Sequence, residues 1–183
     1  MVKDRYEMRL AGSGGQGVIL ASVILAEAAV ISGLNAVQSQ AYGPEARGGV
    51  SKAETIVSRE KIWFSKLRRP DFVLALTQAS VERYSGELRE DGLLMIDDTL
   101  NAPVGFPTER VMALPILATA AEKVGKAFTA NIVAVGAINA ALGLFNDQCL
   151  MEAVKRHIPK GTEEINKKAL EAGAALIGAR QPG

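Results

Sequence analysis

The sequence predicts an α/β fold, a three-layer α/β/α sandwich with helices on both faces of one sheet. Two patterns predict it. Segments of strand type alternate with segments of helix type over the first two thirds of the chain, which is typical of α/β domains. The apolar run at residues 72–76 has no polar break, as expected of a strand covered on both faces. At 183 residues, the chain is expected to form a single domain over residues 1–183.

A glycine-rich turn joins the first strand to the first helix. Residues 6–11 alternate apolar and polar side chains and predict a strand. A long apolar helix is expected at residues 16–32, and Gly33 is a natural residue to end it. The order of strand, glycine turn and helix makes this first unit Rossmann-like.

The middle of the chain predicts short strands separated by turn residues. Residues 61–64 are expected to pair with the strand at residues 52–58, and a helix is expected at residues 79–88. The strands expected after the first are residues 35–42, 52–58, 72–76, 93–96 and 110–114.

The last third of the chain is predicted to be helical. Helices are expected at residues 116–124 and 131–144, and Asp147 and Thr162 are expected to cap two more. Their inward stripes are predicted to be Leu150, Met151, Val154 and Ile158 in one helix and Ile165, Ala169, Ala172 and Leu176 in the other.

Composition excludes several classes of protein. Hydrophobic residues make up 48% and charged residues 22%, so a disordered chain is excluded. Lys and Arg number 21 against 20 Asp and Glu, so no basic excess points to nucleic acid or an anionic membrane. The N-terminal residues are charged and lack the apolar core of a signal peptide, so a cytoplasmic location is expected. The uncharged stretch at residues 127–146 is long enough to span a bilayer, but its Thr129, Asn131 and Asn139 favour a buried helix.

A single cysteine and a single histidine limit the chemistry of the chain. Cys149 alone cannot form an internal disulfide or hold an iron–sulfur cluster, and it is expected to be buried and inert. With His157 as the one histidine, a metal site made of His and Cys is not expected. Asp97 and Asp98 follow a buried-type strand, but no third ligand for Mg²⁺ is evident, which favours a turn or capping role.

The first candidate binding site is the glycine turn. Gly12, Gly14 and Gly17 fit the pattern G-x-G-x-x-G, with Gly15 between them. In one interpretation, the backbone and the helix N-terminus contact a phosphate or another part of a cofactor. In the other, the glycines serve only close packing. Residues 37–41 lack the carboxylate that holds the ribose of NAD, so a standard NAD site is disfavoured.

The second candidate is the loop at residues 43–49. It sets Glu45 and Arg47 between a proline at its start and the flexible pair Gly48 and Gly49. Arg47 can make a bidentate contact with a phosphate or carboxylate, and Glu45 can orient it or contact a partner. A solvated loop with an ordinary charge pair is the alternative.

Two further groups suggest contacts with a partner. Trp63 and Phe64 lie in a short segment flanked by charges and predict either an interface anchor or an ordinary core contact. Lys66, Arg68 and Arg69 suit an acidic partner or a nucleotide, with a solvated turn as the default.

Four segments together resemble a known family. They are residues 9–17 (RLAGSGGQG), 39–49 (SQAYGPEARGG), 70–76 (PDFVLAL) and 131–137 (NIVAVGA). The chain resembles, nearly end to end, the gamma subunit of 2-oxoacid:acceptor oxidoreductases, the ferredoxin- or flavodoxin-linked enzymes. The form YGPEARGG looks like the 2-oxoglutarate branch of that family.

The resemblance implies a subunit without autonomous activity. Such complexes convert a 2-oxoacid and coenzyme A to an acyl-CoA, CO2 and reduced ferredoxin or flavodoxin. Thiamine diphosphate and iron–sulfur clusters are then expected on partner subunits, the alpha, beta and ferredoxin-like delta chains, and two gamma chains are expected to meet as a homodimer. The two glycine-rich loops would help shape the coenzyme A or thiamine diphosphate site. The alternatives are a free-standing Rossmann-like nucleotide-binding protein and a module that serves only assembly.

Overall fold

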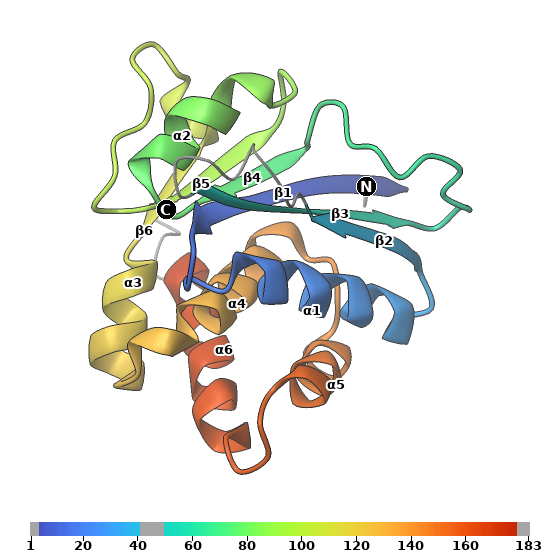
Figure 1. The fold of residues 1–183 in the computed structure, drawn as a ribbon, viewed down its shortest axis with the longest axis vertical. Coiled ribbons are helices and arrows are strands. Elements are labelled where there is room, and N and C mark those ends of the chain that lie inside the picture. The colour runs from blue at the N-terminus through green and yellow to red at the C-terminus, as the bar shows by residue number, and fades with distance from the viewer. Residues whose placement is uncertain (1–3, 41–49, 179–183) are drawn as a thin grey trace.

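A mixed sheet forms the centre of the molecule (Figure 1). The computed structural model describes residues 4–40 and 50–178, and within them six strands pair in the order β2-β3-β1-β4-β5-β6. The strands are β1 (Arg5–Ser13), β2 (Asn35–Gln40), β3 (Val50–Ser58), β4 (Phe72–Ala75), β5 (Leu93–Asp97) and β6 (Val111–Leu114). Strands β1, β4, β5 and β6 run parallel, whereas β3 is antiparallel to both of its neighbours.

Helices cover both faces of this sheet, as Figure 1 shows, with most of them below it. The helices are α1 (Val18–Ile31), α2 (Gln78–Tyr84), α3 (Ile116–Ala118), α4 (Ala130–Leu142), α5 (Asp147–His157) and α6 (Glu163–Gly178). Helix α2 lies on the upper face and continues into a 3₁₀ turn at Ser85–Glu87. The predicted three-layer α/β sandwich is therefore confirmed.

Two separate cores hold the layers together. The larger core lies between the sheet and the lower helices and buries Met8, Leu10, Phe72 and Leu74 completely. The smaller core packs Val73, Ala75, Leu94 and Ile96 of the sheet against Val81, Tyr84 and Leu88 of the upper layer. Every residue of β4 is fully buried, which confirms the strand predicted to be covered on both faces.

The strand predicted at residues 61–64 is wrong. Residues 61–67 adopt neither helix nor strand. The physical reason is that β3 has no free edge, because β1 pairs with one side of it and β2 with the other. The segment between β3 and β4 instead crosses the upper face of the sheet, beyond the part that α2 covers (Figure 1).

The predicted helices are present, with local differences at their ends. Gly33 follows α1 in the left-handed region at φ 78°, as expected of a residue that ends a helix. The cap of α5 is Asn146, one residue before the predicted Asp147, and its side chain accepts the N–H of Cys149 at 2.8 Å. Thr162 precedes α6 as predicted, but its hydroxyl donates to Pro159 O at 2.6 Å instead of capping a helix N–H. Cys149 is half-buried, not buried as expected.

The helix predicted at residues 116–124 changes type within its length. It begins as α3 and continues as a π-helix at Thr119–Val124. The helix predicted at residues 79–88 likewise becomes α2 followed by its 3₁₀ turn. Among the described residues, no helix combines the length and apolarity needed to cross a membrane.

Helices α4 and α6 cross with their backbones in contact. A Cβ built on Gly173 of α6 would overlap the carbonyl oxygen of Val133 in α4, and one built on Gly136 would overlap the carbonyl oxygen of Leu170. Glycine at both positions is what allows this approach. The contact between α4 and α6 fixes the lower helix layer, and with it the part of α4 that lies beside the glycine turn.

Candidate functional site

The glycine turn lies at a switch point of the sheet. Strands β1 and β4 are parallel neighbours, and the helix after β1 packs on the lower face while the helix after β4 packs on the upper face. In open α/β sheets, ligands bind outside the carboxyl ends of the strands at such a switch point. The turn occupies this position, because Leu76 N at the end of β4 donates to Ala11 O in β1 at 3.0 Å.

The conformation of the turn depends on Gln16, which the sequence analysis did not single out. Its Oε1 accepts the N–H of Ser13 at 2.7 Å, and its Nε2 donates to Leu76 O at 3.1 Å. A Cβ on Gly12 would lie 2.5 Å from that Oε1. Gly12 is therefore needed to make room for the amide of Gln16, which fastens the turn to the end of β4. Nothing in the glycine motif reveals this role, since the motif leaves the position open.

Gly17 also serves packing. Its φ is 70°, and a Cβ there would lie 2.7 Å from Nδ2 of Asn131 in α4. Asn131 is buried, so it has little room to withdraw. Both requirements favour glycine, one for backbone conformation and one for space.

Gly14 and Gly15 differ from these two glycines because they are exposed. Among residues 4–40 and 50–178, no heavy atom lies within 4 Å of a Cβ built on either residue, apart from chain neighbours. Gly15 has a φ of 92°, which a residue with a Cβ rarely adopts. The packing interpretation of the motif therefore applies to Gly12 and Gly17. The ligand interpretation applies to Gly14 and Gly15, which are open to an approaching ligand.

The N-terminus of α1, next to this exposed pair, has no side-chain cap. Gly17 precedes the helix, and its first turn holds no acidic residue. The first N–H groups of an uncapped helix carry a partial positive charge and suit an anion. The turn and the helix start can therefore supply backbone donors to a phosphate or carboxylate.

The residue that follows the second predicted loop pairs with the end of the strand that leads into the glycine turn. Glu45, Arg47, Gly48 and Gly49 lie outside the described residues. Val50, which follows them, pairs directly with Ser13 at the end of β1.

A dinucleotide site of the usual kind does not fit this sheet. In a Rossmann fold the second strand lies beside the first and carries the ribose-binding carboxylate. Here β3 lies between β1 and β2, so the end of β2 is one strand further from the glycine turn. This strand order and the missing carboxylate both disfavour a free-standing NAD-binding protein.

Asp97 holds a turn and does not offer a metal site. Its Oδ1 accepts the N–H of Thr99 at 3.2 Å and the hydroxyl of Thr99 at 2.6 Å. Its Oδ2 accepts the N–H of Leu117 in α3 at 2.8 Å. The turn and capping role expected for this carboxylate is confirmed. Within residues 4–40 and 50–178, no group of three His, Cys, Asp or Glu side chains could hold a metal ion.

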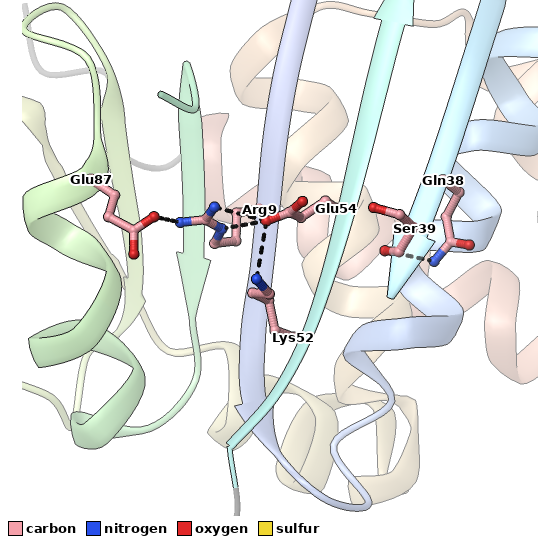
Figure 2. Close-up of polar contacts among 6 residues, drawn as sticks. All are labelled: Arg9, Gln38, Ser39, Lys52, Glu54 and Glu87. Carbon is pink, nitrogen blue, oxygen red and sulfur yellow. Dashed lines mark hydrogen bonds and ion pairs between the residues drawn. The ribbon is translucent and has the colours of Figure 1, made fainter. Parts of the chain in front are cut away.

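A buried ion network crosses the upper face of the sheet close to the turn. Figure 2 shows Arg9 between Glu87 on one side and Glu54 on the other. Arg9 is only 4% exposed, donates to Glu54 Oε1 at 2.8 and 2.9 Å, and lies 5.1 Å from the centroid of the Tyr84 ring. Lys52 Nζ lies 3.4 Å from the same Glu54 oxygen.

This network fixes the charge of Arg9. Burial lowers the pKa of Arg9, but its hydrogen bonds to Glu87 and Glu54 outweigh burial and leave the pKa above its ordinary value. These residues were not predicted as a cluster, because the polar positions of an alternating strand, Glu7 included, gave no reason to single out Arg9. Glu54 and Glu87, the partners of Arg9, are 45 and 78 positions away along the chain, and the sequence alone does not reveal these contacts.

The remaining sequence candidates lie apart from the turn. His157, at the end of α5, has its Nε2 4.0 Å from Oε2 of Glu27 in α1. Trp63 and Phe64 are exposed on the upper face, which excludes the core interpretation for both.

Comparison with known proteins places the chain in a family. A profile of the pyruvate ferredoxin/flavodoxin oxidoreductase family matches residues 7–176. The 2-oxoglutarate synthase subunit KorC of Methanothermobacter marburgensis is 43% identical, over 94% of this chain and 97% of its own length. The corresponding subunit of Methanocaldococcus jannaschii is 39% identical over 94% of both chains.

Solved structures share the fold. The gamma subunit of a keto/oxoacid ferredoxin oxidoreductase from Geobacter sulfurreducens superposes with a TM-score of 0.84 at 43% identity, covering 95% of this chain and 99% of its own. A 2-oxoglutarate:ferredoxin oxidoreductase from Magnetococcus marinus has a TM-score of 0.83 at 23% identity, covering 99% of this chain and 32% of its own, which shows the common fold alone. From the profile match and the two KorC relatives together, the chain belongs to the pyruvate ferredoxin/flavodoxin oxidoreductase family.

Proposed function

We propose that this chain is the gamma subunit of a multi-subunit 2-oxoacid:ferredoxin or flavodoxin oxidoreductase that acts on 2-oxoglutarate. The reaction converts 2-oxoglutarate and coenzyme A to succinyl-CoA and CO2, and the two electrons released reduce the acceptor. The observation that carries the proposal is the 43% identity to a 2-oxoglutarate synthase subunit over nearly the whole of both chains. The YGPEARGG segment supports the choice of 2-oxoglutarate among 2-oxoacids.

The cofactors of the reaction belong, in this proposal, to partner subunits. One cysteine cannot ligate an iron–sulfur cluster, which needs four protein ligands. The residues of this chain therefore do not fit a cluster, and no electron-transfer step is assigned to it. We place thiamine diphosphate and the clusters on alpha, beta and ferredoxin-like delta subunits, in a cytoplasmic complex that also contains a pair of gamma chains.

The contribution of this chain is to help bind coenzyme A or a neighbouring subunit at the switch point of the sheet. Gly14 and Gly15 leave the backbone open to a ligand, and the uncapped start of α1 offers N–H donors to an anion. Gly12 and Gly17 hold that turn in shape. Val50, the residue after the 43–49 loop, pairs with Ser13 at the turn, and we propose that Arg47 of that loop supplies a permanent positive charge to the same ligand.

Arg47 is the residue on which this proposal is tested. In the complex assembled with its partner subunits, Arg47→Ala should raise the KM for coenzyme A or weaken assembly by roughly tenfold to a hundredfold. This is the change expected when one charge-assisted hydrogen bond is lost. Arg47→Lys keeps the charge and loses the bidentate geometry, so its effect on the KM or on assembly should lie between those of the wild type and Arg47→Ala. The melting temperature of the free chain should not change.

Steady-state kinetics with coenzyme A varied, and mass photometry of the assembled complex, measure the two effects. A variant complex that assembles and turns over like the wild type would leave Arg47 as a solvated loop residue. Failure of the wild-type chain to associate with any such subunits would refute the assignment as a whole.

A further inference from the structure

The segment between β3 and β4 presents two large aromatic side chains to solvent. Trp63 is 75% exposed and Phe64 is 79% exposed. The ring of Trp63 has Lys61 Nζ 4.4 Å from its centroid, so a cation lies over it. Adjacent exposed aromatic side chains are a common mark of a protein–protein interface.

These aromatic side chains line part of a longer groove. Trp63 and Phe64 line a cleft of about 700 Å³ together with Arg5 and Glu7 of β1. A second cleft of about 610 Å³ shares Glu7 and Arg68 with the first. Because the two clefts share two lining residues, they lie next to each other at the start of β1, and we refer to the two together as the groove.

The groove carries positive charge that the described part of the chain does not neutralise. Lys66, Arg68 and Arg69 are exposed, and no carboxylate among the described residues lies within ion-pair distance of them. Lys66 and Arg68 flank the aromatic cleft, and Arg68 and Arg69 flank the second cleft. Lys66 and Arg68 therefore lie beside the aromatic side chains, and Arg69 extends the positive charge along the second cleft.

Two of the three acidic side chains of the groove pair with arginines that also line it. Glu7 pairs with Arg5 at 2.8 Å, and Asp91 lies 3.6 Å from Arg89. Glu90 is exposed and lines the second cleft but not the aromatic cleft. The aromatic cleft itself has three cations, Arg5 included, against the single carboxylate of Glu7.

We propose that this groove docks an acidic segment of a partner subunit, with an apolar side chain of that segment lying against Trp63 and Phe64. The proposal rests on the assignment of the chain to a multi-subunit complex. Charge decides against a second copy of this chain, because a two-fold axis at the groove would bring the same cations against each other. An acidic partner instead pairs Lys66, Arg68 and Arg69 while the aromatic rings are withdrawn from water.

Trp63 is the only tryptophan of the chain, which gives the test a specific probe. The chain is labelled with 5-fluorotryptophan and mixed with unlabelled partner subunits, so that one ¹⁹F resonance reports on Trp63. The free chain should show a full H2O/D2O isotope shift of this resonance, and the assembled complex should lose most of it. A resonance that stays fully solvent-sensitive in the assembled complex overturns the docking surface and leaves the subunit assignment intact.

Charge reversal tests the acidic nature of the partner. The double variant Arg68→Glu, Arg69→Glu should weaken association by about tenfold or more and reduce its dependence on salt. The matched control is Lys123→Glu with Lys126→Glu, two exposed cations in and just after the π-helix Thr119–Val124. That helix continues α3 on the lower side of the sheet (Figure 1), so this control should leave association unchanged.

Two outcomes overturn the proposal, one from the charge variants and one from the fluorotryptophan resonance. Equal weakening by both double variants would show a nonspecific charge effect. Protection of Trp63 in the free chain as its concentration rises would show that a second copy covers the groove. If the wild-type chain does not associate with the partner subunits at all, the subunit assignment fails together with the docking surface.

Discussion

Alanine at Gly17 and at Gly14 separates the packing glycines of the turn from the exposed ones. At Gly17, the left-handed φ of 70° costs a residue with a Cβ about 1–2 kcal/mol. The same Cβ would lie 2.7–3.0 Å from the side chain of the buried Asn131, and overpacking of this kind costs about 1–3 kcal/mol. Together, Gly17→Ala should lower the free energy of unfolding by about 2–5 kcal/mol, or roughly 4–20 °C in Tm for a chain of this size.

Gly14→Ala is the matched control for stability and the test for function. Its Cβ meets nothing within 4 Å, so the free energy of unfolding should stay within about 0.5 kcal/mol of the wild type. In the assembled complex, however, the added methyl group should raise the KM for coenzyme A if a ligand approaches the turn there. Thermal unfolding of both free variants measures the first effect. A Gly17→Ala chain that unfolds at the wild-type temperature would refute the packing argument.

Three further predictions concern stability, measured by thermal unfolding of the full chain. Gly173→Ala should destabilise the chain by about 1–3 kcal/mol, because helix α4 must move away, whereas Gly178→Ala in the same helix has open space and should be neutral or stabilising; equal effects would contradict the helix contact. Glu54→Gln should cost about 1.5–3 kcal/mol, because it removes a charged acceptor from the buried Arg9, and an unchanged Tm would mean that the network is not formed. The pKa of Glu163 lies below its ordinary value of 4.5, because its carboxylate accepts backbone N–H bonds at the start of α6. Glu163→Gln should therefore lower Tm at pH 7. The difference in Tm from the wild type should fade as the pH falls through the pKa of Glu163 in the folded chain, since only the ionised carboxylate stabilises the fold. A difference in Tm that grows in acid would contradict this sign.

Local sequence patterns were sufficient to predict most elements in chain order. Alternation at residues 6–11, the unbroken apolar run at 72–76 and the stop at Gly33 each correspond to an observed strand or helix end. These features depend on neighbours within a few positions, which the sequence displays directly. The layer architecture followed because interleaved strands and helices have few ways to bury their apolar faces.

The order of strands within the sheet could not be predicted in the same way. Strand β3 lies between β1 and β2, although it follows both along the chain. That placement depends on pairings between distant residues, such as Ser13 with Val50. The strand wrongly expected at residues 61–64 has the same cause, because the sequence did not reveal that strands pair with both edges of β3.

The candidate site shows the same division between local and distant information. The glycine turn was predicted from its motif, but the motif does not separate Gly17 from Gly14. An added Cβ would overlap Asn131 of α4 at Gly17, whereas at Gly14 it would meet no heavy atom of the described residues within 4 Å. The role of Gln16 depends on Leu76, which is 60 positions away. Glu45 and Arg47 remain predictions from sequence.

Reconstitution tests most directly the central claim that this chain is an essential subunit with no activity of its own. The measurement is the rate of viologen reduction with 2-oxoglutarate, coenzyme A and thiamine diphosphate. It is made on this chain alone, on the partner subunits without it, and on the two recombined. We predict no turnover above background for the chain alone and restored turnover on recombination. Turnover by the purified chain alone, or full activity of the partner subunits without it, would contradict the account.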